Sequence, residues 1–142
     1  MLMPDRFGQS PFGLGEEDWR VLTTARVHVM LVGPEPLTSQ IVDALRPTFV
    51  EPIAQWVPHE RNDLSRPCGT LLLSDAGQLT LDDQQRLDEW LTSGAAPQVV
   101  TMASAPLFPL VEQGRFLASL YYRLNVVYLS FEPADSRAGI PR

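Results

Sequence analysis

Residues 110–129, LVEQGRFLASLYYRLNVVYL, decide the fold of this chain. Gly114 ends a short amphipathic turn, and the β-branched pair Val126 and Val127 near the end of the segment indicates a strand. Between them, four apolar side chains share one stripe at helical spacing: Phe116, Leu120, Tyr121 and Leu124. The segment therefore predicts a helix that packs through one face and leads directly into a β-strand.

The same alternation of strand and helix extends upstream. Residues 69–75, GTLLLSD, predict a buried strand, and residues 99–103 predict another. The helix between them is predicted from Thr80 as its N-cap, Asp82 and Asp83 in its first turn, and Gly94 past its end. Its expected buried stripe consists of Leu87, Trp90 and Leu91.

The N-terminal half repeats this pattern. Residues 16–26 predict a helix, and the apolar run 27–32 is typical of a central parallel strand. A second helix, ended by Pro47, is predicted by four residues at helical spacing: Thr38, Ile41, Val42 and Leu45. Residues 49–57 predict a further strand, bent by Pro52.

These elements together predict an α/β fold, a three-layer α/β/α sandwich around a mainly parallel five-stranded sheet. The expected division is a flexible N-terminal segment at 1–15, the α/β domain at 16–131 and a polar C-terminal tail at 132–142. A chain of 142 residues with 44% hydrophobic and 20% charged residues suits one compact soluble domain.

Charge and composition exclude several functions. The net charge of −6 speaks against a nucleic-acid or membrane partner, and the absence of an apolar signal core favours the cytoplasm. Cys68 is the only cysteine, and neither His28 nor His59 has neighbours at ligand spacing, so no disulfide and no metal site is expected. All eleven basic residues are arginine, which excludes any chemistry that needs a lysine.

Three segments resemble the AAA+ domain of sigma-54-dependent transcription activators. GRFLASLYYRLNVV at 114–127 is similar to the family's GRF…DLYYRLNVV, and GTLLLSD is similar to its Walker B strand GTLFLDE. GQLTLDDQQRLDEWL at 77–91 parallels GDLPLELQAKLLRVL, and Gly8, Ser10 and Pro11 match an opening Gly-x-Ser-Pro turn. The resemblance covers about Phe7 to Leu129 and implies a P-loop NTPase-like fold, here with the lid subdomain absent.

The resemblance also shows where the family's phosphate-binding loop would lie. GPEPLTSQ at 33–40 stands where the family has GESGTGKE, so Gly33 is kept, Thr38 occupies a glycine position and Ser39 occupies the lysine position. Pro34 and Pro36 each remove a backbone N–H that a phosphate would use. Glu35 between them adds a negative charge beside the expected anion site.

The magnesium and γ-phosphate groups of the family are replaced as well. Ser74 and Asp75 stand at the Walker B Asp and Glu, and Ser104 corresponds to the family's sensor Asn. By its own sequence context, Asp75 is typical of a turn or cap residue. The resemblance thus implies a vestigial nucleotide site, no catalytic residues, no cofactor and no metal, with these site residues: Gly33, Thr38, Ser39, Ser74, Asp75 and Ser104.

In the family, two arginines reach the ATP of a neighbouring subunit, and this sequence retains one of them. Leu117 replaces the first, whereas Arg123 keeps the second and is a candidate subunit-interface residue, with a solvated or intramolecular role as the alternative. Both loops by which the family contacts the sigma factor are missing from this sequence.

The function expected from the resemblance is a non-catalytic protein-interaction module in bacterial transcription regulation. Its partner would be a protein, either a sigma-54-dependent activator or further copies of the chain. The alternative is a residual ATP-binding protein or weak ATPase, with ATP and Mg²⁺ as ligands of Thr38, Ser39 and Asp75. A third hypothesis, a pseudo-receiver domain, is disfavoured because Asp75 has neither an acidic pair nor a lysine partner.

Overall fold

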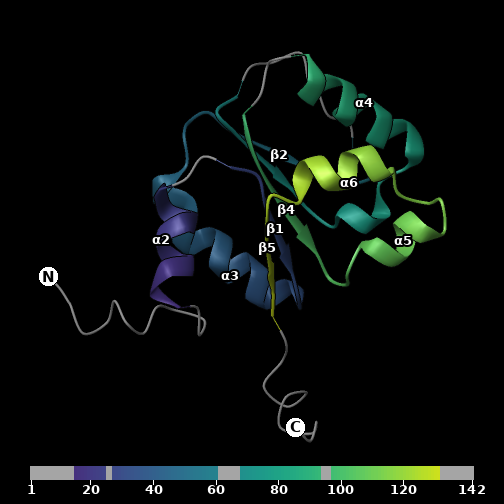
Figure 1. Ribbon diagram of the computed structural model, residues 1–142. Coiled ribbons are helices and arrows are strands. Elements are labelled where there is room, and N and C mark those ends of the chain that lie inside the picture. The colour runs from purple at the N-terminus through teal and green to yellow at the C-terminus, as the bar shows by residue number, and fades with distance from the viewer. Residues whose placement is uncertain (1–14, 25–26, 61–67, 94–96, 132–142) are drawn as a thin grey trace, which may run out of the picture.

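A computed structural model of the chain describes residues 15–24, 27–60, 68–93 and 97–131 (Figure 1). Almost all of the predicted N-terminal segment, the predicted tail at 132–142, the Gly-x-Ser-Pro match and Gly94 lie outside these residues. The strands are β1 (Val29–Val32), β2 (Ile53–Trp56), β3 (Thr70–Leu73), β4 (Gln98–Ala103) and β5 (Val127–Ser130). The α-helices are α2 (Glu16–Thr24), α3 (Glu35–Leu45), α4 (Leu81–Thr92), α5 (Phe108–Glu112) and α6 (Ala118–Leu124).

All five strands run parallel in one sheet with the order β2-β3-β4-β1-β5. β1 lies between β4 and β5, with Val29 opposite both Val100 and Val127. Its four side chains are all buried, as the continuous apolar run predicted. The predicted α/β sandwich is confirmed, and the sheet is entirely rather than mainly parallel.

Two helical layers cover the sheet (Figure 1). α2 and α3 pack on one face, where Leu22, Ile41 and Leu45 join the buried side chains of one core cluster. α4 and α6 pack on the opposite face, with α5 beside them, and Leu87 and Leu120 are fully buried there. The four stripe residues of the 110–129 segment are all buried, although Phe116 precedes the helix that Ala118 begins.

Two local predictions are wrong. The second strand does not extend over 49–57: β2 begins at Ile53, where its pairing with β3 begins. The residue before it, Pro52, has no N–H, and its carbonyl accepts hydrogen bonds from the N–H groups of Gly69 and Thr70. Trp90 is half-buried rather than buried, because it lies at the margin of the core. In the first turn of α4 the buried residue is Gln84. The predicted cap is confirmed: the Thr80 side chain accepts a hydrogen bond from the Asp83 N–H over 3.1 Å.

Gln84 connects α4 to the segment before α6. Its side chain is 1% exposed, and Nε2 donates to the carbonyls of Leu79 at 3.0 Å and Arg115 at 3.1 Å. Its Oε1 accepts from the N–H of Leu117 at 2.7 Å. These three bonds satisfy a buried amide and fix the chain just before α6 begins. None of the helices that the structure describes has the length and apolarity to span a bilayer.

Candidate functional site

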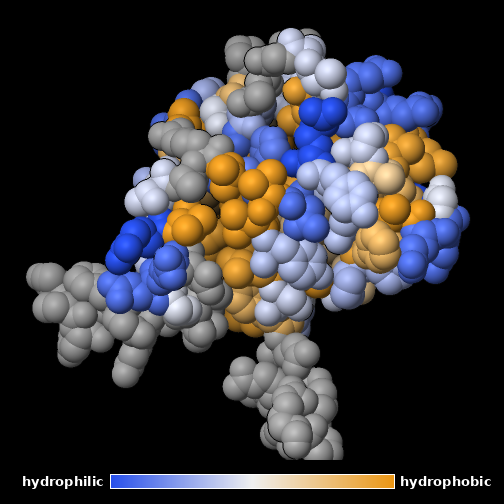
Figure 2. Space-filling model, in the orientation of Figure 1, coloured by the Kyte–Doolittle hydropathy of each residue, from blue (hydrophilic) through white to orange (hydrophobic). Residues whose placement is uncertain are grey.

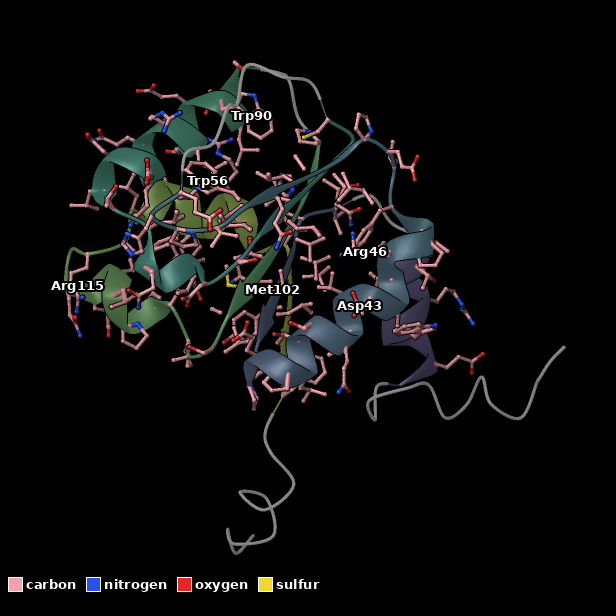
Figure 3. The ribbon with its side chains drawn as sticks, turned by 180° about the vertical axis from the view of Figure 1, so that it is seen from behind. Asp43, Arg46, Trp56, Trp90, Met102 and Arg115 are labelled. Carbon is pink, nitrogen blue, oxygen red and sulfur yellow. The ribbon has the colours of Figure 1, made fainter. Side chains whose placement is uncertain are left out.

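A hollow of about 280 Å³ opens at the carboxyl ends of β1, β3 and β4, beside α3. β1 and β4 are neighbours, but the connection from β1 leads to β2 at one edge of the sheet and that from β4 leads to β5 at the other. Parallel α/β sheets bind ligands at such a reversal, outside the strand ends. Figure 3 shows the molecule from this side, with Asp43 on α3, Arg46 just past the end of α3 and Met102 on β4.

All six residues of the predicted vestigial nucleotide site line this hollow. Gly33 follows β1, Thr38 and Ser39 lie in α3, and the remaining three follow β3 or β4: Ser74, Asp75 and Ser104. They meet because the carboxyl ends of parallel strands share one edge of the sheet. The structure thus brings together residues that are up to 71 positions apart in the sequence.

The turn from β1 into α3 has few free backbone donors. α3 begins at Glu35, so only Gly33 and Pro34 separate it from β1. Pro34 and Pro36 have no N–H, and the N–H groups of Leu37 and Thr38 both donate to the Pro34 carbonyl at 3.0 Å. Within this first turn, which is described in full, only the Glu35 N–H is left over. A phosphate-binding loop needs a run of such groups turned toward the ligand.

Thr38 and Ser39 are helical residues here rather than parts of a loop. Thr38 is 2% exposed, and its hydroxyl donates to the Glu35 carbonyl at 3.2 Å. Ser39 is exposed one residue further along α3. Both therefore stand on a regular helix whose first turn is closed by its own hydrogen bonds.

Gly33 has a packing reason to be glycine. A Cβ at this position would lie 2.9 Å from the carbonyl oxygen of Phe131 and 3.1 Å from its Cβ. The N–H of Gly33 donates to Ala103 at 2.9 Å, and the N–H of Phe131 donates to Val32 at 2.7 Å. The close approach of two backbone segments thus accounts for this glycine without any ligand.

The charge in the hollow is mainly negative. Glu35, Asp43 and Asp75 contribute carboxylates, and Arg46 contributes the one guanidinium among the described lining residues. Arg46 Nη2 lies 3.8 Å from Oδ1 of Asp43, one helical turn away. Across the described residues, no three His, Cys, Asp or Glu side chains are arranged to hold a metal ion.

Asp75 has the local structure of a turn residue. Its φ of 51° and ψ of 52° lie in the left-handed region, and it directly precedes the 3₁₀ turn Ala76–Gln78. Its carbonyl accepts a hydrogen bond from the Gln78 N–H at 2.9 Å. Ser74, at the family's magnesium-binding position, instead accepts a hydrogen bond from Gln55 Nε2 at 3.3 Å.

Sequence reasoning missed Asp43, Arg46, Gln55 and Met102 as lining residues. One signal for the first two was present, because Ser39, Asp43 and Arg46 recur at i, i+4 and i+7, which places Ser39, Asp43 and the C-cap residue Arg46 along one side of α3. Gln55 and Met102 come from β2 and β4, and only the sheet order places them beside α3.

Arg123 lies away from the hollow and pairs within the chain. Its Nε donates to Oδ1 of Asp88 at 3.0 Å, and the hydroxyl of Ser119 donates to Oδ2 of the same carboxylate at 2.6 Å. Arg123 therefore forms an intramolecular ion pair, which was the alternative to a subunit-interface role. A contact of Arg123 with a second subunit stays a prediction.

The sequence of the chain is similar to parts of known bacterial regulatory proteins. The chain is 34% identical over 87 residues to a Nif-specific regulatory protein of Rhizobium leguminosarum bv. trifolii, covering 52% of this chain and 25% of that protein. It is 35% identical over 82 residues to the DNA-binding transcriptional regulator NtrC of Rhizobium meliloti, covering 49% and 17%. The chain is a partial homologue of the sigma-54 activator AAA+ domain.

Solved structures match the fold of this chain. The P-loop NTPase domain of the sigma-54 transport activator from E. coli matches 85% of the chain and 99% of its own length, with a TM-score of 0.55 and 18% identity. NtrX from Brucella abortus in complex with ADP matches 96% of the chain and 38% of its own, with a TM-score of 0.65 and 15% identity. The chain spans a quarter or less of the curated relatives it matches, and no family model matches it.

Proposed function

We propose that this chain is a non-catalytic relative of the sigma-54 activator ATPase domain and acts as a protein-interaction module in bacterial transcription regulation. The observation that carries the proposal is the turn between β1 and α3, where two prolines and two internally bonded N–H groups leave one backbone donor. A triphosphate in the hollow would meet Glu35, Asp43 and Asp75, with a single arginine already beside Asp43. Neither a phosphate chain nor its magnesium ion fits these groups.

The interaction role is supported by side chains left uncovered. Tyr122 is 62% exposed and Val126 is 56% exposed, and both lie where α6 leads into β5. Large exposed aromatic and branched apolar groups of this kind mark surfaces that a second protein covers.

Calorimetry and a phosphate-release assay test the loss of nucleotide chemistry. The purified chain is expected to give no binding heat with millimolar ATP and Mg²⁺ and no phosphate release above that of buffer. Micromolar affinity, or magnesium-dependent hydrolysis abolished by Asp75→Asn and retained in the control Asp82→Asn, would overturn the proposal. Asp82 is a suitable control because it is an exposed carboxylate outside the hollow.

A residual nucleotide binder is the second candidate. It is favoured by the convergence of all six predicted residues on one hollow, with Thr38, Ser39 and Asp75 as the ligands. The same calorimetry decides between the two functions, because a nucleotide site gives saturable heat that Ser39→Ala weakens.

The interaction arm is tested with a purified ATPase domain of an NtrC-type activator. Titration into the labelled chain is expected to show saturable binding that Tyr122→Ser weakens and the control Leu81→Ser does not. Leu81 is a fair control because it is a large apolar side chain, 46% exposed, on a different helix. A chain that stays monomeric and ignores the activator domain contradicts the proposed module.

A further inference from the structure

β5 forms one edge of the sheet; it is short, at four residues, and carries no charged residue and no proline. It pairs with β1 on one side only, and no described strand lies on its other side. Residues 124–131, LNVVYLSF, contain no charge and no proline. Soluble proteins normally protect a sheet edge with charged side chains, prolines or bulges, because a bare edge pairs with other strands.

The opposite edge of the sheet shows the contrast. β2 is bracketed by Pro52 and Pro58, and its exposed Gln55 side chain bonds to Ser74. Both edge strands are uncharged, but Pro52 directly precedes β2 and Pro58 follows it closely, whereas the nearest charge and proline after β5 are Glu132 and Pro133. An edge without charge or proline is a template on which a further strand can pair.

The backbone groups of β5 alternate between β1 and the outside. The N–H of Val127 donates to His28 and that of Phe131 donates to Val32, so the odd-numbered residues face β1. Tyr128 and its even-numbered neighbours therefore direct their N–H and C=O groups outward, where a further strand would bind them.

Apolar side chains flank this row of backbone groups on both faces of the sheet. Val127 and Leu129 lie on the face of α2 and α3, half-buried at the edge of that core. Tyr128, 38% exposed, alternates to the face of α6, near Tyr121. Figure 2 shows hydrophobic surface gathered along this edge, on the near side of the molecule.

We propose that a second copy of this chain covers the edge, with the two β5 strands pairing antiparallel about a two-fold axis at Tyr128. This rests on the proposed function, because it names one partner of the interaction module, a second copy of the chain. In this register Tyr128 exchanges both of its outward hydrogen bonds with Tyr128 of the partner subunit, and Val126 lies opposite the partner subunit's Ser130. An uncharged strand is what lets two copies of a chain with net charge −6 meet here.

Light scattering and sedimentation equilibrium over a concentration series test the pairing. The wild-type chain is expected to be dimeric, and Tyr128→Glu and Tyr128→Arg are each expected to weaken the dimer at least tenfold, because like charges then face each other across the axis. Mixing the two variants is expected to restore a mixed dimer, since the facing charges are then opposite. Leu81→Glu and Leu81→Arg, on α4, are the matched controls and leave the dimer intact.

Restoration on mixing separates pairing from misfolding, because a misfolded variant gains nothing from its counterpart. Val126→Glu, at a more exposed position, provides a second variant that is expected to weaken the dimer. A monomeric wild type, a dimer that both Tyr128 variants leave unchanged, or no recovery on mixing would each overturn the inference. A monomer that still binds an activator domain overturns only the self-pairing, whereas magnesium-dependent ATP hydrolysis overturns the proposed function whatever the size of the particle.

Discussion

The carboxylate of Asp88 on α4 accepts a hydrogen bond from Arg123 Nε at 3.0 Å and so ties α4 to α6. The side chain of Asp88 is only 19% exposed, and Ser119 donates to its other oxygen at 2.6 Å. The arginine that in the activator resemblance would reach a neighbouring subunit is thus held by its own chain.

Removing this carboxylate is expected to destabilise the domain more than removing either donor. Asp88→Ala loses both hydrogen bonds and should lower the free energy of unfolding by about 1–2 kcal/mol, against about 0.5–1 kcal/mol for Arg123→Ala. Urea unfolding followed by tryptophan fluorescence measures both, and a double-mutant cycle should give a coupling of about 0.5 kcal/mol or more. Glu16→Ala breaks an exposed pair with Arg20 and is the control, with a smaller effect. A coupling energy of zero between Asp88 and Arg123 would show that this hydrogen bond does not stabilise the contact between α4 and α6.

Gln84 offers a sharper test of the α4 contact. Gln84→Glu keeps the shape but turns a donor that faces the carbonyls of Leu79 and Arg115 into an acceptor. The free energy of unfolding should fall by about 2–4 kcal/mol at neutral pH, because a buried carboxylate then faces two carbonyl oxygens. Thermal melting monitored by circular dichroism measures the loss. The same change at the exposed neighbour Gln85 should cost less than about 0.5 kcal/mol, and equal effects at the two positions would refute this role of Gln84.

His28 should make stability depend on pH. Its Nδ1 accepts the Val99 N–H at 3.0 Å, and burial, assisted by the nearby Arg123 guanidinium, lowers its pKa below the ordinary 6.5. The unfolded chain therefore takes up the proton more readily, so stability is full above pH 6.5 and falls as the pH drops toward the lowered pKa. His28→Asn should flatten this part of the unfolding curve relative to the wild type, whereas the exposed His59→Asn should not. Parallel pH profiles for all three proteins would argue against it.

Gly33 should be sensitive to substitution without any nucleotide present. Gly33→Ala places a Cβ 2.9 Å from the Phe131 carbonyl oxygen, so the two backbone segments must separate, at a cost of about 1–3 kcal/mol in urea unfolding. Gly77→Ala is the matched control, because its Cβ would meet only Leu107 and Leu110 side chains at 3.6 Å. If Gly33→Ala left stability unchanged, packing against Phe131 would not explain this glycine.

Much of the fold was predictable because it follows from local patterns. The apolar run before Gly33 and the stripe of Leu120, Tyr121 and Leu124 each identify an element and its buried face, and both predictions hold. The start of β2 was not predictable from apolarity, because the pairing partners Gly69 and Thr70 are supplied by a distant segment. Gln84 was missed for the same reason, since a glutamine in a helix normally faces water and its partners meet only in the folded chain.

The sequence was sufficient to predict six residues of the candidate site, but not the backbone structure and hydrogen bonds around them. The resemblance selected six residues, and the parallel sheet gathers them at one hollow. The sequence match alone does not define the bounds of α3. The short turn and the bonded N–H groups of Leu37 and Thr38 depend on where α3 begins, and the Arg46–Asp43 pair lies where it ends.

The place of β1 between β4 and β5 has a consequence for how the protein is made. During translation, residues 29–32 are made before both of their neighbours in the sheet, residues 98–103 and 127–130. The apolar strand β1 thus gains its first hydrogen-bonded neighbour only after residues 98–103 have been made, and its second only after residues 127–130. Until residues 127–130 have been made, the apolar strand β1 lacks at least one of its neighbours. A chaperone that binds this strand would protect it from pairing with other chains during synthesis.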